Sequence, residues 1–119
     1  MKYLIVTLRD NDFTSEGREL GILIQSLLFN ELEEPEEIID RINSDTAEFL
    51  KEKIAILWST AHDFWMNLRF NDCQNTKAYM LKNLQLLIWD DKDIEEELEC
   101  PNAELIVIPL SYNKEPYVL

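Results

Sequence analysis

Two runs of apolar residues near opposite ends of the chain most strongly constrain its fold. The first covers residues 2–8 and reads KYLIVTL, and the second covers residues 104–110 and reads ELIVIPL. Short runs rich in β-branched and aromatic residues predict buried strands. Pro109 places the end of the second run near a sheet edge, and the tail at 112–119 can add an edge strand. The chain is therefore predicted to build a small sheet that contains its N-terminal strand and a C-terminal strand.

A helix is predicted after the first strand, because apolar residues there recur on one face. Thr14 or Ser15 can cap its N-terminus. The apolar positions follow the spacing i, i+3, i+4, i+7 and i+8, at Leu20, Leu23, Ile24, Leu27 and Leu28. Gly17 and Gly21 lie inside this helix, where each costs about 1 kcal/mol relative to alanine. They therefore either admit a close neighbour or mark a weak first turn.

Two further helices are predicted in the middle of the chain. Pro35 suits the first position of a short helix that is interrupted at Asn43. Asp45 and Glu48 resemble a capping box that opens a longer helix of about five turns. The apolar stripe of the longer helix contains Leu50, Ile54, Leu57, Trp58, Ala61, Trp65 and Leu68.

The segment 78–89 fits both a helix and a strand, since its leucines satisfy either spacing. We predict a helical turn or two that passes into a strand near 86–89. Residues 90–100 are predicted to be an acidic connector that can form one short helix before Pro101. Because there is no internal repeat, low-complexity tract or Gly/Ser linker, residues 1–119 are predicted to form a single α+β domain. Two or three helices would pack on its small sheet.

The sequence predicts a cytoplasmic protein without a membrane-spanning segment. The longest stretch without charge, residues 20–30, has eleven residues, whereas a bilayer-spanning helix requires roughly 20. The uncharged run at residues 3–8 is short and no small-residue cleavage site follows it, so no signal peptide is predicted. In a reducing compartment, Cys73 and Cys100 are expected to remain free thiols.

Negative charge is concentrated in two blocks. The chain has 24 acidic and 11 basic residues, a net charge of −13. Residues 31–53 have a net charge of −6 and residues 90–119 a net charge of −7, so the remaining segments sum to zero. The carboxylates at the centres of these blocks are the predicted partner-binding residues. They are Glu31, Glu33, Glu34, Glu36, Glu37 and Asp40 in the first block, and Asp90, Asp91, Asp93, Glu95, Glu96 and Glu97 in the second.

This distribution of charge favours a basic protein as the partner. Nucleic acid and anionic membranes are bound through Lys/Arg patches, so direct binding to either is not predicted. Clustered like charges oppose compaction and exceed what solubility needs, and a cationic surface would relieve that repulsion. The alternative is that both blocks are solvated loops and helix ends, in which the glutamates after Pro35 only complement a helix N-terminus.

No motif for catalysis, metal binding or cofactor binding is found in the sequence. His62 is the single histidine, and Cys73 and Cys100 lack CxxC spacing, so neither a histidine-based triad nor a zinc site is predicted. The run from Asp91 resembles the start of a calcium loop, but it has Glu96 where an EF-hand needs glycine. Two glycines cannot supply a phosphate-binding loop. We therefore expect a protein that binds a partner without metal or cofactor, and not an enzyme.

The leading hypothesis is an immunity or inhibitor protein that covers the cationic surface of a basic toxin such as a nuclease. A variant is nucleic-acid mimicry, in which the acids imitate phosphates and occupy a DNA-binding or restriction protein. The remaining alternatives are a small carboxylate-dependent enzyme and a structural adaptor subunit. An adaptor would use an apolar patch. Phe49, Ile56 and Phe64 lie off the main stripe of their helix, so that helix either is covered on two sides or carries such a patch for dimerisation or partner binding. The sequence leaves the oligomeric state and the choice of acidic block open.

Overall fold

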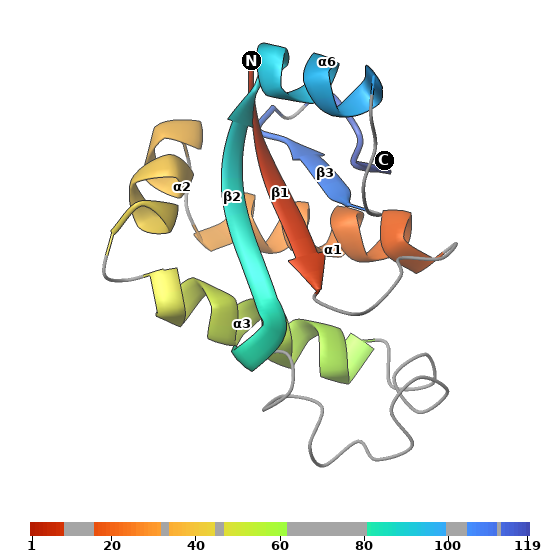
Figure 1. Ribbon diagram of the computed structural model, residues 1–119. Helices are drawn as coiled ribbons and strands as arrows, with labels where there is room; N and C mark the ends of the chain where they lie inside the picture. The colour runs from red at the N-terminus through yellow and green to blue at the C-terminus, as the bar shows by residue number, and fades with distance from the viewer. Residues whose placement is uncertain (9–15, 32–33, 45–46, 62–80, 100–104, 112) are drawn as a thin grey trace.

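The computed structural model describes residues 1–8, 16–31, 34–44, 47–61, 81–99, 105–111 and 113–119. Within these ranges the chain forms a four-stranded sheet, four helices and a short helical segment at 81–83 (Figure 1). The strands are β1 (Lys2–Leu8), β2 (Leu84–Asp90), β3 (Ile106–Pro109) and β4 (Tyr117–Val118), and the helices are α1 (Glu16–Glu31), α2 (Pro35–Ile42), α3 (Ala47–Ala61) and α6 (Asp91–Glu99). The architecture belongs to the α+β class, as the sequence predicts. None of the described helices is long and apolar enough to cross a bilayer.

β1 lies inside the sheet, whose strand order is β2-β1-β3-β4 with every pair antiparallel. It pairs with β2 along its whole length, from Lys2 opposite Asp90 to Leu8 opposite Leu84. Its other edge pairs with β3, which in turn pairs with the short strand β4. The predicted N-terminal and C-terminal strands are therefore direct neighbours, and the C-terminal tail supplies the edge strand.

The main core lies on one face of the sheet, under three helices. Leu4 and Val6 of β1 point into it and meet Ile24 of α1, Ile38 of α2 and Ile54 of α3. Figure 1 shows α1 behind the strands, with α2 and α3 beside and below them. Burial of this continuous apolar surface is the main favourable term that holds the helices on the sheet.

A smaller core lies on the opposite face. Tyr3 and Ile5 of β1 meet Val107 of β3 and Ile94 of α6 there. α6 crosses the upper end of the sheet in Figure 1. Because successive strand residues point to opposite faces, covering both faces explains why the N-terminal run is apolar without alternation.

The described helices agree with the predicted ones. α1 spans the predicted segment and buries three of its five predicted apolar positions, and α2 begins at Pro35. α3 starts at Ala47 and corresponds to the first part of the predicted long helix. The capping residues predicted at 14–15 and 45 lie outside the described residues, as do the helical positions predicted at 65 and 68.

The ambiguous segment resolves into a helix followed by a strand. Residues 81–83 are helical and β2 begins at Leu84, two residues before the predicted start. Pairing with β1 decides the outcome, because the buried backbone groups of β1 need a hydrogen-bonded neighbour on that side. The acidic connector predicted after this strand forms the nine-residue helix α6.

Gly21 lies where α1 packs against β3 and the C-terminal tail. A Cβ atom on Gly21 would stand 2.7 Å from Cβ of Pro116 and 2.9 Å from Cγ2 of Ile106, which is closer than such atoms normally approach. The first of the two explanations for this glycine, a close neighbour, is therefore confirmed. One turn further along α1, the side-chain amide of Gln25 donates a hydrogen bond to the carbonyl oxygen of Pro109 at 2.8 Å.

We expect Gly21→Ala to lower the free energy of unfolding by about 1 kcal/mol. Overpacking against two atoms closer than 3.0 Å costs roughly 2 kcal/mol, and the better helix propensity of alanine recovers about 1 kcal/mol of it. Urea unfolding followed by tryptophan fluorescence measures the change. Ser26→Ala, at an exposed position of the same helix, is the matched control and should not destabilise. A variant Gly21→Ala as stable as the unchanged chain would show that α1 does not need this close approach.

Candidate functional site

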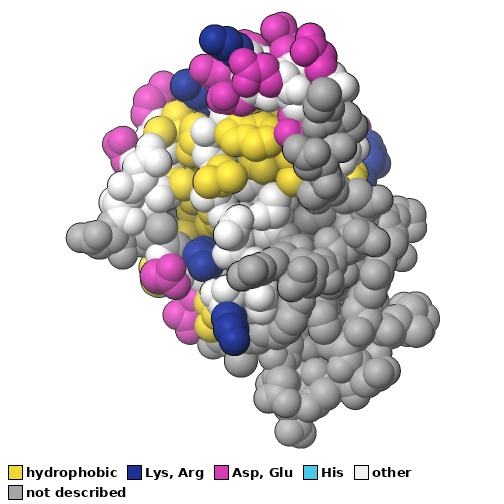
Figure 2. Space-filling view, in the orientation of Figure 1, with side chains coloured by type: hydrophobic (Ala, Val, Ile, Leu, Met, Phe, Trp, Pro, Cys, Tyr) yellow, Lys and Arg dark blue, Asp and Glu magenta, His cyan; other side chains and the backbone are white. Residues whose placement is uncertain are grey.

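α6 carries most of the second acidic block. Its sequence, DKDIEEELE, contains six carboxylates and one lysine. Figure 2 shows Asp and Glu side chains gathered over the upper end of the molecule, where α6 lies, and hydrophobic side chains on the sheet face below them. The predicted residues of this block are therefore collected on one helix and the turn before it.

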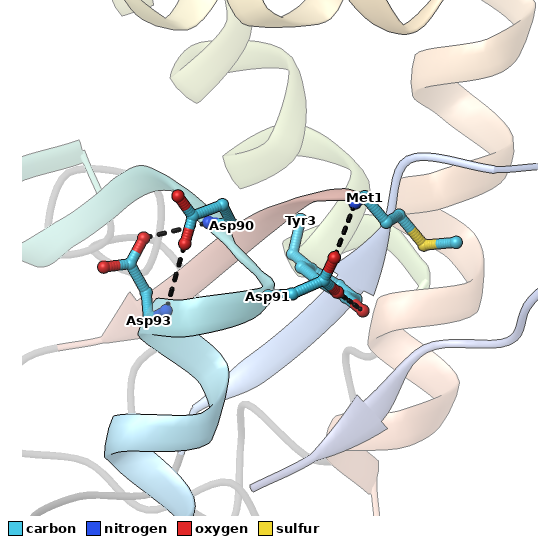
Figure 3. Close-up of polar contacts among 5 residues, drawn as sticks. All are labelled: Met1, Tyr3, Asp90, Asp91 and Asp93. Atoms are coloured by element: carbon cyan, nitrogen blue, oxygen red, sulfur yellow. Dashed lines mark hydrogen bonds and ion pairs between the residues drawn. The ribbon is translucent and has the colours of Figure 1, made fainter.

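Asp90 and Asp93 use their carboxylates to begin α6 (Figure 3). The backbone N–H of Asp93 donates to Oδ1 of Asp90 at 3.1 Å, and the backbone N–H of Asp90 donates to Oδ2 of Asp93 at 2.9 Å. This reciprocal arrangement has the form of a capping box. The hydrogen bond from the Asp93 backbone holds the pKa of the Asp90 carboxyl below its ordinary value. Both carboxylates therefore have a structural role in the turn from β2 into α6.

Asp91 connects α6 to the start of β1. Its Oδ2 accepts a hydrogen bond from the amino group of Met1 at 2.7 Å, and its Oδ1 accepts one from the Tyr3 hydroxyl at 2.9 Å (Figure 3). The bond from the amino group, followed by the bond from Tyr3, lowers the pKa of Asp91. The same bond from Tyr3, together with burial of the phenol, raises the pKa of Tyr3 to about 12. No local signal could have predicted this contact, because the two residues are 88 positions apart.

The second half of α6 presents three exposed glutamates, Glu95, Glu96 and Glu99, which we call the α6 glutamates. None of them forms an ion pair with another described residue. Their position opposes the helix macrodipole, whose C-terminal end is negative, and the last turn of α6 has no basic residue. Glu95 and Glu99 also repel each other as like charges four residues apart. The helix macrodipole therefore gives no reason for these carboxylates, although Lys92 lies one turn before Glu95 and Glu96 on the same helix.

The first acidic block is arranged differently. Glu36 and Glu37 are exposed in the first turn of α2, where negative charge complements the positive end of the helix macrodipole. Asp40 is exposed, and Arg41 follows it in the last turn, where positive charge is favourable. Most of the described charge on α2 therefore has an ordinary structural explanation, in contrast to the α6 glutamates.

Glu34 and Glu97 fit neither of these two descriptions. Of the first block, Glu34 is exposed at the N-cap of α2 and makes no side-chain capping bond. Residues that lie outside the described part of the chain, or whose side chains do, are Glu31, Glu33, His62, Phe64, Cys73 and Cys100. Glu97 is half-buried on α6.

Exposed apolar side chains accompany the acidic ones. Leu98, within the acidic run of α6, is 59% exposed, and Leu87 of β2 is 45% exposed. Phe49 and Ile56 of α3, predicted to lie off the main stripe, are also exposed. Sequence reasoning missed Leu98, because its spacing of four from the buried Ile94 is what a buried helical face would show. Leu98 therefore adds an exposed apolar side chain to a helix surface that is otherwise acidic.

Within the described residues, no group of three or more His, Cys, Asp or Glu side chains is placed to hold a metal ion. Comparison of the chain with protein-family models, with curated proteins and with solved structures finds no match.

Asp91→Asn is expected to lower the pKa of Tyr3 from about 12 toward its ordinary value of 10.0. The amide accepts a weaker hydrogen bond from the phenol than the carboxylate does, and it places no negative charge beside it. Titration of the tyrosine ultraviolet absorbance measures this pKa. The variant Tyr3→Phe identifies which of the four tyrosine transitions belongs to Tyr3. Since the fold favours the protonated phenol, its contribution to stability is complete below pH 10.0 and is lost as the pH rises through about 12. An unchanged alkaline transition in Asp91→Asn would disprove the contact.

Asp90→Asn is expected to reduce the loss of stability on acidification. The lowered pKa of Asp90 means that the fold favours its carboxylate, so this contribution is present above the ordinary pKa of 3.8 and disappears as the pH falls through the lower value in the fold. Asparagine caps helices about as well as aspartate, so the variant keeps the cap and loses only the pH-dependent contribution of the carboxylate. The variant and the unchanged chain should therefore differ less in stability at acidic than at neutral pH. The midpoints of urea unfolding, measured for both proteins between acidic and neutral pH, test this prediction. An equal effect of Asp40→Asn would assign the result to net charge and not to the cap.

Proposed function

We propose that this chain is an acidic protein-binding module, an immunity or inhibitor protein that neutralises a basic toxin such as a nuclease by covering its cationic surface. The observation that carries the proposal is the set of α6 glutamates, which are exposed and unfavourable for the helix that bears them. Choices that break local rules of stability concentrate at functional sites. The proposal includes a cytoplasmic location and no catalytic activity of the chain itself.

The proposed contact surface is α6, and α2 has at most a secondary part. The carboxylates at 90–93 are engaged in capping α6 and in contact with β1, so they hold the helix in place. The α6 glutamates are exposed beyond this anchored turn and can meet arginine or lysine side chains of the partner. Charge complementarity of this kind raises the association rate and fixes orientation. Leu98 supplies an apolar contact among them, of the kind found at interface centres.

Covering the cationic surface would be sufficient for inhibition. A nuclease binds the phosphates of its substrate mainly through Lys and Arg, and a partner that occupies these side chains excludes the substrate. Nucleic-acid mimicry is the variant in which the α6 glutamates stand directly in the positions of phosphates. The two differ in whether inhibitor and nucleic acid contact the same basic side chains, which competition binding with oligonucleotide distinguishes once the partner is isolated.

Neutralising the α6 glutamates with Glu95→Gln, Glu96→Gln and Glu99→Gln should slow association with the basic partner. The partner is first isolated by affinity capture, and association is then followed by stopped-flow fluorescence at several salt concentrations. We expect the association rate constant to fall about tenfold or more at low salt, and the difference to shrink as salt screens the charges. The fold should be unaffected, because these side chains make no ion pair with other described residues.

The matched control removes three charges from α2 with Glu36→Gln, Glu37→Gln and Asp40→Asn, and we expect a smaller effect. An unchanged rate constant for the α6 variant would exclude α6 as the contact surface. A loss confined to the α2 variant would transfer the contact to the first acidic block. If the captured partner is a nuclease, one equivalent of the unchanged chain should abolish its cleavage activity, and full activity in the complex would refute inhibition.

A further inference from the structure

The outer edge of β2 carries backbone groups that β1 does not use. The backbone N–H of Leu110 donates to the carbonyl oxygen of Lys2 at 3.1 Å, so the backbone groups of Lys2 point toward β3. In an antiparallel strand, successive residues direct these groups to opposite neighbours. The backbone groups that point toward β2 are therefore those of Tyr3, Ile5 and Thr7. The register places these residues opposite Trp89, Leu87 and Gln85.

The backbone groups of the alternate residues Leu84, Leu86 and Ile88 consequently point away from β1. Two observations support this alternation. Pro109, which lacks an N–H, lies opposite Tyr3, where no hydrogen bond to β1 is required. The backbone N–H of Asp90, the next outward position of β2, is bonded to the Asp93 carboxylate. No backbone hydrogen bond joins the outward groups at 84, 86 and 88 to another described segment outside the regular ladders.

A groove runs along this edge. Four consecutive residues of β2, 84–87, line it together with Ile42 of α2 and with Glu48 and Lys51 of α3, and its volume is about 370 Å³. Because consecutive side chains of a strand point to opposite faces, a hollow that touches all four residues must lie beside the strand backbone. Nζ of Lys51 lies 3.7 Å from Oε1 of Glu48, and the two charges offset each other. The groove is therefore largely neutral where α3 lines it.

The sequence of β2 itself carries none of the features that usually protect a sheet edge. Natural edge strands are short, or carry lysine, proline or a bulge that blocks pairing. β4, at the other edge, has two residues, whereas β2 has seven and contains neither proline nor a basic residue. Its register with β1 is continuous, without a bulge. Such an edge is a template for an added strand.

We propose that the outer edge of β2 binds an extended segment of the basic partner by strand addition. The inference rests on the proposed function for the partner's charge. The outward groups of Leu84, Leu86 and Ile88 would supply main-chain hydrogen bonds, and the exposed Leu87 would contact an apolar side chain of the added strand. Lysine or arginine at the end of that strand near Asp90 would reach the acidic residues of α6.

A second copy of the chain fits this edge less well than a basic segment. Each copy carries a net charge of −13, and two such chains repel each other at short range. The acidic helix α6 directly follows β2, so an approaching strand meets negative charge at that end of the edge. Attraction for a basic segment and repulsion of a like-charged copy therefore have the same source.

The test uses the full chain and a synthetic peptide of alternating threonine and valine flanked by lysines, with a glutamate-flanked twin as control. Amide hydrogen exchange measured by NMR should slow at Leu86 and Ile88 by about tenfold or more when the lysine peptide binds. The amide of Leu87, already bonded to β1, should not change and serves as internal reference. Equal binding of the two peptides, or protection that spares Leu86 and Ile88, would overturn the proposal.

The double variant Gln85→Lys, Leu87→Lys places positive charge at two exposed positions of the edge and should weaken binding of the lysine peptide about tenfold or more. The control double variant, Ser26→Lys with Asn30→Lys, adds the same charge on α1 and should weaken binding of the lysine peptide less. With the native partner, impairment by the α6 triple variant but not by the β2 double variant would refute strand addition and leave the proposed function standing. A dimer in sedimentation velocity that the β2 double variant dissociates would assign the edge to a second copy and refute the proposed occupant.

Discussion

The structure depends on the pairing of β1 along both of its edges. The side chains of Leu4, Ile5 and Val6 are fully buried, so their backbone N–H and C=O groups would carry a large free-energy cost if they lacked partners. The partners come from residues 84–90 on one side and 106–109 on the other. The intervening chain must therefore return to β1 twice, and the helices α1, α2 and α3 occupy the first of these excursions. α6 occupies the second, which places it beside the N-terminal end of β1.

That placement determines which acidic residues are structural. Because β2 runs antiparallel to β1, it ends where β1 begins, with Asp90 opposite Lys2. The turn into α6 then brings Asp91 within hydrogen-bonding distance of Tyr3 and the amino group of Met1. The carboxylates at the start of α6 are thus fixed by the sheet, whereas Glu95, Glu96 and Glu99 are exposed further along the helix. The distinction between anchoring and exposed acids follows from strand direction, which charge counting alone does not contain.

The sequence was sufficient for the elements whose patterns are local. The uninterrupted apolar run of β1, the helical spacing of α1 and the proline at the start of α2 each determine a conformation from neighbouring residues. It was insufficient where long-range contacts decide, as in the helix-to-strand change near Leu84, which pairing with β1 settles. The close packing at Gly21 and the contact between Tyr3 and Asp91 join residues far apart in sequence. The two acidic blocks could be located from the sequence alone. The capping role of Asp90 and the exposure of Leu98 depend on the fold around them and could not be predicted from the sequence.

The charge of α6 and the outer edge of β2 are linked by position, because α6 begins at the residue after β2 ends. An uncapped strand of seven residues is an aggregation hazard when nothing prevents identical chains from pairing along it. Lysine on the edge is a common safeguard, but it would also repel a basic partner. Negative charge placed beside the edge, on a helix that starts where the strand ends, discourages pairing between copies by mutual repulsion and leaves the backbone groups accessible. In the proposed binding mode, the α6 glutamates help the edge to select a basic segment over a second copy of the chain, although their placement is unfavourable for the helix that bears them.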